Sequence, residues 1–247
     1  MHIKALSISD RKGMRKTNVD SIELLENFGL AGDAHGGVWH RQVSLLAQES
    51  IDFMRAKGLD VVAGNFAENI TTEGIDLTTL RVGDHLRVGD TEIIISQLVK
   101  ICHRPCAIYH QAGDCVMPRE GIFGVVLTGG TIRVGDEISV LDRHSSTAAI
   151  ICTAETQREY GDRLQEILAR RWSPGCIRFD SLNQAGDNLP ALLQDLTATQ
   201  AVDRILIFDP AGRHLPGLAG YPLPAAGQPG DGTIVSHCRT LSEVEGL

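Results

Sequence analysis

The sequence has few aromatic residues, no long hydrophobic run and no excess of basic charge. Aromatic residues make up 4% of the chain while glycine occurs 26 times, which favours a fold of aliphatic strands and frequent turns. The net charge of −8 argues against a surface that binds nucleic acid or an anionic membrane, because no broad positive field would attract phosphates. Since no signal peptide is recognisable, the sequence predicts a cytoplasmic protein.

Half of the six cysteines lie with two histidines in one short stretch, which holds Cys102, His103, Cys106, His110 and Cys115. A disulfide framework is typical of small secreted chains, and structural zinc usually needs paired short spacings that this stretch lacks. Inert burial is the remaining alternative, since free cysteine is among the most buried residue types. Thiols concentrated in this way favour a metal or cofactor site, and inert burial stays open for Cys106 and Cys115.

Residues 1–142 consist of short apolar runs separated by turns that contain glycine and aspartate, which is typical of a β-sandwich or barrel. The predicted strands are residues 3–8, 42–46, 86–88, 93–97, 123–127 and 138–141. One helix is predicted at residues 47–57, where Ile51 and Met54 recur at helical spacing before Gly58.

From residue 145 the pattern changes to strands that alternate with helices, which indicates an α/β unit with a parallel sheet. The predicted elements are strands at residues 148–152 and 205–208 and helices at residues 160–172 and 189–196. A short polar segment at residues 142–147 marks the boundary. The sequence therefore predicts two domains, 1–142 and 148–247, and an α+β fold class overall.

Five motifs in the first domain resemble the MOSC domain, which is named for the carboxy-terminal part of molybdenum-cofactor sulfurases. They are GLAGDAHGG (29–37), WHRQVSLLAQES (39–50), GNFAENITTEGIDL (64–77), LRVGD (80–84) and CHRPCAIYHQAGDCVMPREGIFGVVLTGG (102–130). The resemblance covers nearly all of residues 1–142 and keeps the motifs in family order. It implies a β-barrel-like fold that binds the molybdenum cofactor, molybdopterin with Mo, with one cysteine at the metal.

Within this resemblance Cys102 is the predicted catalytic residue and metal ligand. In bacterial members that reduce N-hydroxylated bases, the metal-binding cysteine follows a strand-ending glutamine by five positions, as Cys102 follows Gln97 here. Molybdenum takes soft thiolate ligands, and the neighbouring Lys100, His103 and Arg104 would lower the pKa of the Cys102 thiol. The same cationic neighbourhood would suit a pterin that carries phosphate.

The remaining predicted cofactor ligands come from the other motifs. Glycines crowd residues 29–37, which indicates a loop that turns tightly or approaches a ligand closely, although an ordinary glycine turn is an alternative. The resemblance makes His35 and Arg41 candidates for contacting the phosphate or the pterin. Asn69 is a candidate for the pterin edges or for fixing a turn, and Arg119 for an anion or for a solvated turn.

The second domain resembles the molybdopterin-binding α/β domain of enzymes that adenylylate molybdopterin and insert the metal. The segments at the matching turns are residues 153–155 and 209–212, and the glycine-rich phosphate loop of that family is largely absent. Pro210 has no N–H to donate and Asp209 would repel phosphate. Asp187 matches an acidic motif residue of that family or a helix N-cap. A degenerate domain kept for docking or scaffolding is therefore predicted.

Two functional classes follow from the resemblance. The first is a carrier that binds molybdenum cofactor and delivers it, with or without sulfur, to molybdoenzymes or cofactor biosynthesis proteins. The second is a reductase of N-hydroxylated substrates, whose electrons would come from an external electron-donor protein because the chain has no iron–sulfur, flavin or haem signature. A bare interaction module is a third alternative. The electron-donor argument favours the carrier.

Overall fold

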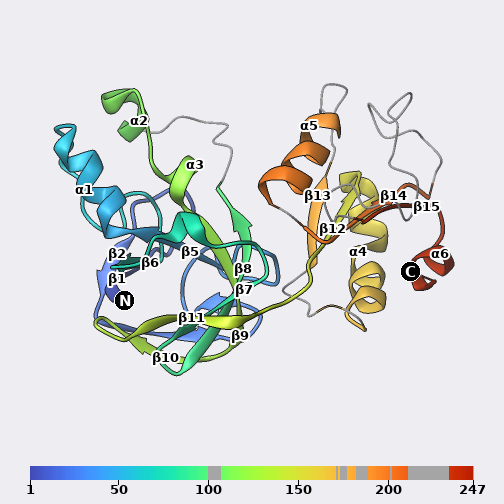
Figure 1. The fold of residues 1–247 in the computed structure, drawn as a ribbon, viewed down its shortest axis with the longest axis horizontal. Coiled ribbons are helices and arrows are strands. Elements are labelled where there is room, and N and C mark those ends of the chain that lie inside the picture. Colours follow the sequence, from blue (N-terminus) through green and yellow to red (C-terminus); the bar gives the residue numbers. More distant parts are fainter. Residues whose placement is uncertain are drawn as a thin grey trace. The chain divides into compact units, whose positions relative to one another are not determined.

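The computed structural model describes residues 1–99, 107–170, 172, 177–181, 189–200, 202–210 and 234–246. The chain divides into two compact units, Met1–Ser145 and Ser146–Leu247, each with its own sheet (Figure 1). They are named the N-terminal unit and the C-terminal unit below. Across the described residues, no helix has the length and apolar character needed to span a bilayer.

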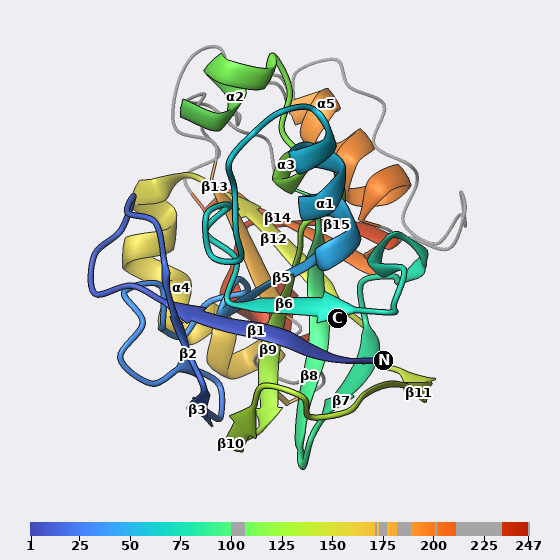
Figure 2. The same cartoon turned by 90° about the vertical axis from the view of Figure 1, so that its left-hand side faces the viewer.

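The N-terminal unit contains a curled sheet whose described strands follow the order β11-β7-β8-β9-β5-β6-β1-β2. In chain order these strands are β1 (His2–Ile8), β2 (Thr17–Val19), β5 (Val43–Ala47), β6 (Ile70–Glu73), β7 (Asp84–Val88), β8 (Thr91–Leu98), β9 (Ile122–Thr128) and β11 (Ile138–His144). Figure 2 shows β1 and β6 running across the direction of β8 and β9. An antiparallel bridge between His2 and Glu137 brings the start of β1 to the start of β11.

A helix makes the parallel connection in this otherwise antiparallel sheet. Helix α1 (Gln48–Ala56) joins β5 to β6, which pair in parallel, and parallel neighbours need such a crossover. Its buried Ile51 and Met54 pack in a cluster that includes Ile108 of α2 (Ala107–Ala112) and Met117 of α3 (Met117–Glu120). A second small sheet has the order β10-β3-β4 and consists of β3 (Ser21–Leu25), β4 (Gly29–Leu30) and β10 (Gly130–Arg133).

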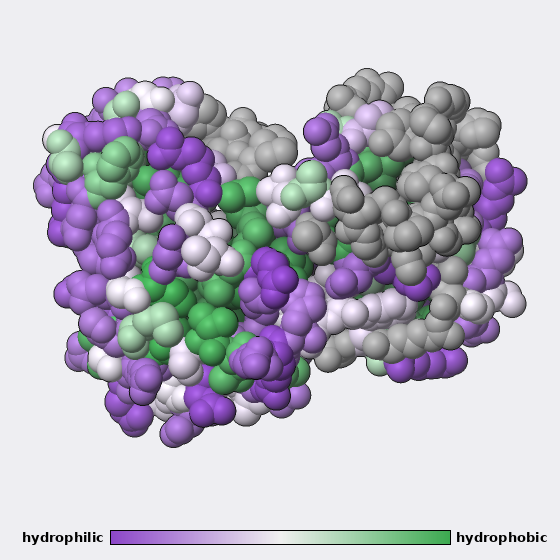
Figure 3. All heavy atoms as spheres, viewed as in Figure 1, coloured by the Kyte–Doolittle hydropathy of each residue, from purple (hydrophilic) through white to green (hydrophobic). Residues whose placement is uncertain are grey.

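Hydrophobic and hydrophilic side chains occupy different parts of the N-terminal unit. Figure 3 shows hydrophilic side chains around its margin and hydrophobic ones toward the middle of the face in view. The main cluster of buried side chains draws on strands from both ends of the curled sheet, for example Leu6 of β1, Leu45 of β5 and Leu86 of β7. The curl therefore encloses one continuous apolar core.

The C-terminal unit is built on a parallel sheet with the order β13-β12-β14-β15. Its described elements are β12 (Ala148–Cys152), α4 (Ala154–Leu168), β13 (Ile177–Ser181), α5 (Leu189–Gln194), the π-helix η3 (Asp195–Thr199), β14 (Arg204–Phe208), β15 (Ile234–Cys238) and α6 (Leu241–Glu245). One sheet face packs on α4 through Leu164 and Leu168 and on α6 through Val244.

The predicted α+β fold class is confirmed, with a curled sheet first and a parallel sheet second. The predicted start of helix α4 at residue 160 is wrong, because the helix begins at Ala154. Thr153 caps it by accepting a hydrogen bond from Thr156 N at 3.1 Å. The turn expected at residues 153–155 is thus a helix N-terminus. Among residues 209–212, Asp209 and Pro210 are described, whereas Asp187 lies outside the described residues.

Candidate functional site

The loop of residues 31–42, between β4 and β5, carries two of the four described residues that were predicted to bind a cofactor, His35 and Arg41. Its two ends meet at Gly29, where an added Cβ atom would lie 2.5 Å from the carbonyl oxygen of Gln42. Gly29 also has a φ of 113°, which disfavours any other residue. The glycines predicted a close backbone approach, and at Gly29 the backbone approaches Gln42 at the far end of the same loop.

A buried ion pair anchors the start of this loop. Lys16 Nζ lies 2.7 Å from Asp33 Oδ2, and the two side chains are 1% and 0% exposed. Asp33 also accepts hydrogen bonds from Asn69 Nδ2 at 2.9 Å and from Ser9 N at 3.0 Å. Burial alone would raise the pKa of Asp33, but its polar neighbours His35, Lys16, Asn69 and Ser9 outweigh burial and hold that pKa well below its ordinary value.

Lys16 responds to the same surroundings. Burial lowers the pKa of its ammonium group, and the hydrogen bond and charge of Asp33, together with the charge of Glu68, oppose that change. Asp33 and Lys16 are both best described as charged partners, because each compensates the desolvation of the other. The pair therefore fixes the loop at Asp33.

His35 lies beside this pair and has unused hydrogen-bonding capacity. Its Nδ1 atom is 3.7 Å from Asp33 Oδ2, which is too long for a hydrogen bond. Within the described part of the chain, this buried nitrogen has no hydrogen-bond partner. The His35 side chain is 27% exposed, and its carbonyl oxygen accepts a hydrogen bond from Trp39 Nε1 at 3.0 Å. The side chain is thus partly exposed, while its buried nitrogen has no hydrogen-bond partner among the described residues.

Asn69 is 1% exposed, and protein atoms satisfy its side chain. Its Oδ1 accepts hydrogen bonds from Ser44 N at 3.1 Å and Ser44 Oγ at 2.9 Å. Its Nδ2 donates to Ser7 O at 3.1 Å as well as to Asp33. Asn69 ties β5, β1 and the loop together in the described structure, and its contact with a pterin stays a prediction.

The end of the loop presents a cation on aromatic rings. The guanidinium carbon of Arg41 lies 4.8 Å from the centroid of the Trp39 ring and 5.9 Å from that of Phe123. Such stacking holds the planar guanidinium group in one orientation. Trp39 was not predicted as part of a site, although its place beside Arg41 in the WHR motif is the signal that points to it.

The next residue, His40, is connected to the end of strand β8. His40 Nε2 lies 3.1 Å from Gln97 Oε1, and Ser96 Oγ donates to the carbonyl oxygen of His40. Gln97 Nε2 in turn donates to Val99 O at 2.8 Å. Gln97 therefore joins the loop to the residues that follow β8, a role that sequence reasoning found only through its spacing from Cys102.

Val99 leaves the strand in an unusual conformation. Its φ is 51°, a left-handed value that a β-branched residue rarely adopts, and its N–H donates to Gly121 O at 2.9 Å. Strained backbone of this kind is found disproportionately at functional sites. Lys100, Cys102 and His103 follow directly but lie outside the described residues, so their predicted roles stay predictions.

Arg119 is placed apart from the loop, in α3. Its Nη1 lies 3.2 Å from Asp114 Oδ2 and its Nη2 lies 3.7 Å from Glu120 Oε1, with half of the side chain exposed. Lys57 Nζ contacts the same Asp114 oxygen at 2.7 Å. Arg119 thus shares its charge with carboxylates, and its anion-binding role also stays a prediction. Cys115, between these residues, is half-buried.

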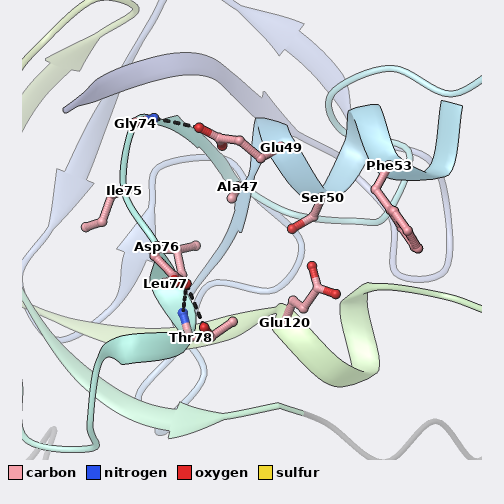
Figure 4. A pocket seen from close by; sticks show the side chains of 10 residues that line it. All are labelled: Ala47, Glu49, Ser50, Phe53, Gly74, Ile75, Asp76, Leu77, Thr78 and Glu120. Carbon is pink, nitrogen blue, oxygen red and sulfur yellow. Dashed lines mark hydrogen bonds between the residues drawn. The ribbon is translucent and has the colours of Figure 1, made fainter. Parts of the chain in front are cut away.

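A surface cleft of about 460 Å³ lies elsewhere in the N-terminal unit, between α1 and the segment after β6 (Figure 4). Glu49, Asp76 and Glu120 contribute three carboxylates to its lining. Glu49 accepts a hydrogen bond from Gly74 N at 2.9 Å, and Asp76 accepts one from Thr78 N at 3.0 Å. These acidic groups would repel a phosphate, so the cleft does not suit a phosphate-bearing cofactor.

The curled sheet, with the loop of residues 31–42 held at its β8 end, defines a β-barrel-like domain. Residues 31–139 match the family model of the MOSC domain. The N-terminal unit is therefore a MOSC domain, a family associated with binding of the molybdenum cofactor. The resemblance of the C-terminal unit to a molybdopterin-binding domain stays a prediction. No curated protein matches the chain.

Three crystal structures are distantly similar. A hypothetical protein shares 21% identity over 58% of this chain and 69% of its own, with a TM-score of 0.45. YiiM from Escherichia coli shares 21% identity over 59% of this chain and 72% of its own, with a TM-score of 0.44. YiiM from Geobacillus stearothermophilus shares 18% identity over 71% of this chain and 92% of its own, with a TM-score of 0.45.

The described residues of the loop fit a pterin cofactor. The partly exposed His35 side chain can exchange a hydrogen bond with a polar ring edge, and the stacked Arg41 guanidinium group suits a phosphate. Among the residues that the structure describes, no group of three or more His, Cys, Asp or Glu could hold a metal ion.

Proposed function

We propose that the N-terminal unit binds the molybdenum cofactor through the Cys102 thiolate and carries it to a molybdoenzyme or a cofactor biosynthesis protein. The observation that carries the proposal is the link from His40 through Gln97 to Val99, which fixes the end of β8 within a MOSC domain. The sequence places Cys102 five positions after Gln97, next to this fixed point.

Arg41, His35 and the Lys16–Asp33 pair each have a defined task in this proposal. Arg41 would hold the phosphate and His35 would hydrogen-bond the pterin, while the Lys16–Asp33 pair keeps the loop in place. Lys100 and His103 would lower the pKa of the Cys102 thiol so that it binds metal as the thiolate. When bound, the cofactor supplies a metal whose remaining ligand positions can accept sulfur or substrate.

A carrier and a reductase differ in what they require from other proteins. A reductase would need a separate electron donor, whereas a carrier needs only a surface that meets its recipient. In this proposal the C-terminal unit would meet the second requirement as a docking or scaffolding unit. Its described thiols do not suit metal binding, because burial and the charge of Asp180 raise the pKa of Cys152 to about 12, and burial raises that of Cys238.

The test is cofactor content after purification from a host that makes molybdenum cofactor. Molybdenum is measured by elemental analysis and the pterin by fluorescence after oxidation, in wild type, Cys102→Ser and Cys115→Ser. Cys115→Ser is the matched control because it removes another cysteine of the same motif. We expect near-stoichiometric molybdenum and pterin in wild type and the control, with at least a tenfold loss in Cys102→Ser, because a hydroxyl is a poor ligand for a soft metal.

Two outcomes would contradict the proposal. Equal loss from Cys102→Ser and Cys115→Ser would indicate a shared thiol cluster rather than one metal-binding cysteine. Wild-type protein without molybdenum or pterin, which also takes up neither when mixed with the released cofactor, would leave only an interaction module.

A further inference from the structure

Three side chains of the N-terminal unit form a hydrogen-bonded chain that the cofactor proposal does not use. Ser145 Oγ lies 2.7 Å from His85 Nε2, and His85 Nδ1 lies 2.5 Å from Glu92 Oε1. This order of hydroxyl, imidazole and carboxylate is that of a nucleophile, its base and the group that orients the base. We propose that Ser145, His85 and Glu92 form a nucleophilic site that hydrolyses small carboxylic esters.

The sheet sets the relation between the base and the carboxylate. In the β7–β8 hairpin, His85 pairs with Ile94 and Arg87 pairs with Glu92. His85 and Glu92 are therefore diagonal neighbours on one face of the sheet, close enough for their side chains to meet. The short turn at Gly89 and Asp90 keeps this register, so the pair is built on rigid elements.

Gly83 allows the backbone of Ser145 to lie close to the start of β7. Ser145 follows β11, and its N–H donates to Gly83 O at 2.9 Å. Gly83 has a φ of 97°, and a Cβ atom added there would lie 2.4 Å from Ser145 O. Only glycine at position 83 lets the backbone of Ser145 approach β7 this closely.

The three residues differ in burial. The His85 side chain is 5% exposed, whereas Glu92, with 15% of its side chain exposed, and Ser145 are both half-buried. The imidazole is thus sheltered from bulk water while Ser145 is partly exposed to solvent. Glu92 also forms an ion pair with Arg143, which supplies a counter-charge at the edge of the site.

The chemistry requires only the ester and water. Ser145 Oγ bonds to the ester carbonyl carbon while its proton passes to His85 Nε2, and the C–O bond to the alcohol then breaks as that proton moves to the leaving oxygen. Water next attacks the acyl-serine carbonyl carbon and gives a proton to His85, which returns it to Ser145 Oγ as the carboxylic acid leaves. Glu92 accepts the His85 Nδ1–H throughout and orients the ring.

The sheltered ring limits the substrate class. Because Ser145 is half-buried and His85 is almost covered, the ester carbonyl must approach Ser145 Oγ from the solvent side, which favours a small acyl group. A reactive leaving group is also required, so the site suits activated short-chain esters rather than amides.

The test uses full-length protein, p-nitrophenyl acetate and a fluorophosphonate probe, with the labelled peptide identified by mass spectrometry. We expect a phosphonyl adduct on Ser145 and ester hydrolysis that falls at least tenfold in Ser145→Ala and in His85→Gln. Ser146→Ala is the matched control because it removes the adjacent, exposed serine, and it should keep both activities.

The same variants separate a nucleophilic role from a purely structural one. Glu92→Gln should change the pH dependence of hydrolysis, which a merely structural hydrogen bond would not do. If His85→Gln fails to fold, Ser145→Ala and Ser145→Cys carry the test, since a thiol at the nucleophile position should still be acylated. Absence of a Ser145 adduct in folded wild type, or hydrolysis unchanged in Ser145→Ala, would overturn the proposal.

Discussion

The two units bury charged side chains in different surroundings. In the N-terminal unit, Lys16 and Asp33 are almost completely buried, and further hydrogen bonds complete the shell of Asp33. In the C-terminal unit, Arg178 and Asp180 form two 2.8 Å hydrogen bonds on the outer strand β13, with 7% and 15% of their side chains exposed.

The difference shows what each pair contributes. The Lys16–Asp33 pair joins segments far apart in sequence and fixes the loop of residues 31–42, so its loss affects the candidate site. The Arg178–Asp180 pair joins two residues of one strand, and within the described residues the buried Nη1 atom of Arg178 has no hydrogen-bond partner. The fully buried Lys16–Asp33 pair, which joins distant segments, should therefore contribute more to stability than the Arg178–Asp180 pair within one edge strand.

The largest expected effect on stability comes from breaking the buried Lys16–Asp33 pair. Asp33→Ala should lower the free energy of unfolding of the N-terminal unit by about 3–5 kcal/mol, because the Lys16 ammonium group stays buried without its partner. Urea unfolding followed by Trp39 fluorescence in a Trp172→Phe background reports on this unit alone, since the chain has two tryptophans. Asp52→Ala removes an exposed carboxylate and should change stability by no more than about 0.5 kcal/mol. Equal effects of the two substitutions would refute the argument.

The local pair should matter less. Asp180→Ala should cost the C-terminal unit about 1.5–3 kcal/mol, the range for hydrogen bonds to charged groups, because water can reach this partly exposed edge. The measurement is urea unfolding followed by Trp172 fluorescence in a Trp39→Phe background. A cost larger than that of Asp33→Ala would reverse the comparison.

Acid should weaken the N-terminal unit through Asp33. Its folded-state pKa lies below the unfolded value of about 3.9, so its contribution is complete above about pH 4 and is lost as the pH falls toward the folded-state pKa. Glu68 acts in the opposite direction, because burial raises its pKa. Glu68 is present in both wild type and Asp33→Asn, so its contribution to the pH dependence cancels when the two are compared. The variant should lose less stability below pH 4. Parallel curves would show that Asp33 does not titrate in this window.

The thiols offer a smaller contrast between the units. Cys152 and Cys238 should resist iodoacetamide at pH 8 because their pKa values are raised, and both should react once the protein is unfolded in urea. Cys115 is half-buried and should react first among the described cysteines. Peptide mapping by mass spectrometry gives the rate for each residue. Fast alkylation of native Cys152 would contradict its inert burial.

The smallest effect concerns a helix end. Thr240 forms a capping box with Glu243 at the start of α6, and Thr240→Ala should cost about 0.5–1 kcal/mol. Thr240→Ser keeps the hydroxyl group and should be nearly neutral. Trp172 fluorescence again reports the unfolding, and equal losses in both variants would exclude capping as the cause.

Local patterns predicted the strands and helix α1 where apolar periodicity was strong, as in β8 and β12. Strand β13 was not predicted, although its residues alternate between apolar and polar as in a half-buried strand, and the pairing of Arg178 with Asp180 is invisible without the fold. The WHR motif pointed to Arg41, but the stacking on Trp39 and the link from His40 to Gln97 depend on tertiary structure.

Long-range polar partners were also beyond reach. Lys16 lies in a basic segment that is typical of exposed residues, and only the fold brings it to Asp33. Likewise, Ser145 and His85 are far apart in the sequence and meet only because β7 and β11 pair.

The bridge between His2 and Glu137 has a consequence for how the chain is made. It joins residues from opposite ends of the N-terminal unit, and β1 also pairs with β6 rather than with its nearest neighbours alone. Contacts of such large sequence separation slow folding, because a long loop must close before they form. During synthesis, the growing chain must therefore hold its first strand in an incomplete sheet until the segment around residue 137 leaves the ribosome, so this unit should depend on chaperones more than a locally connected one.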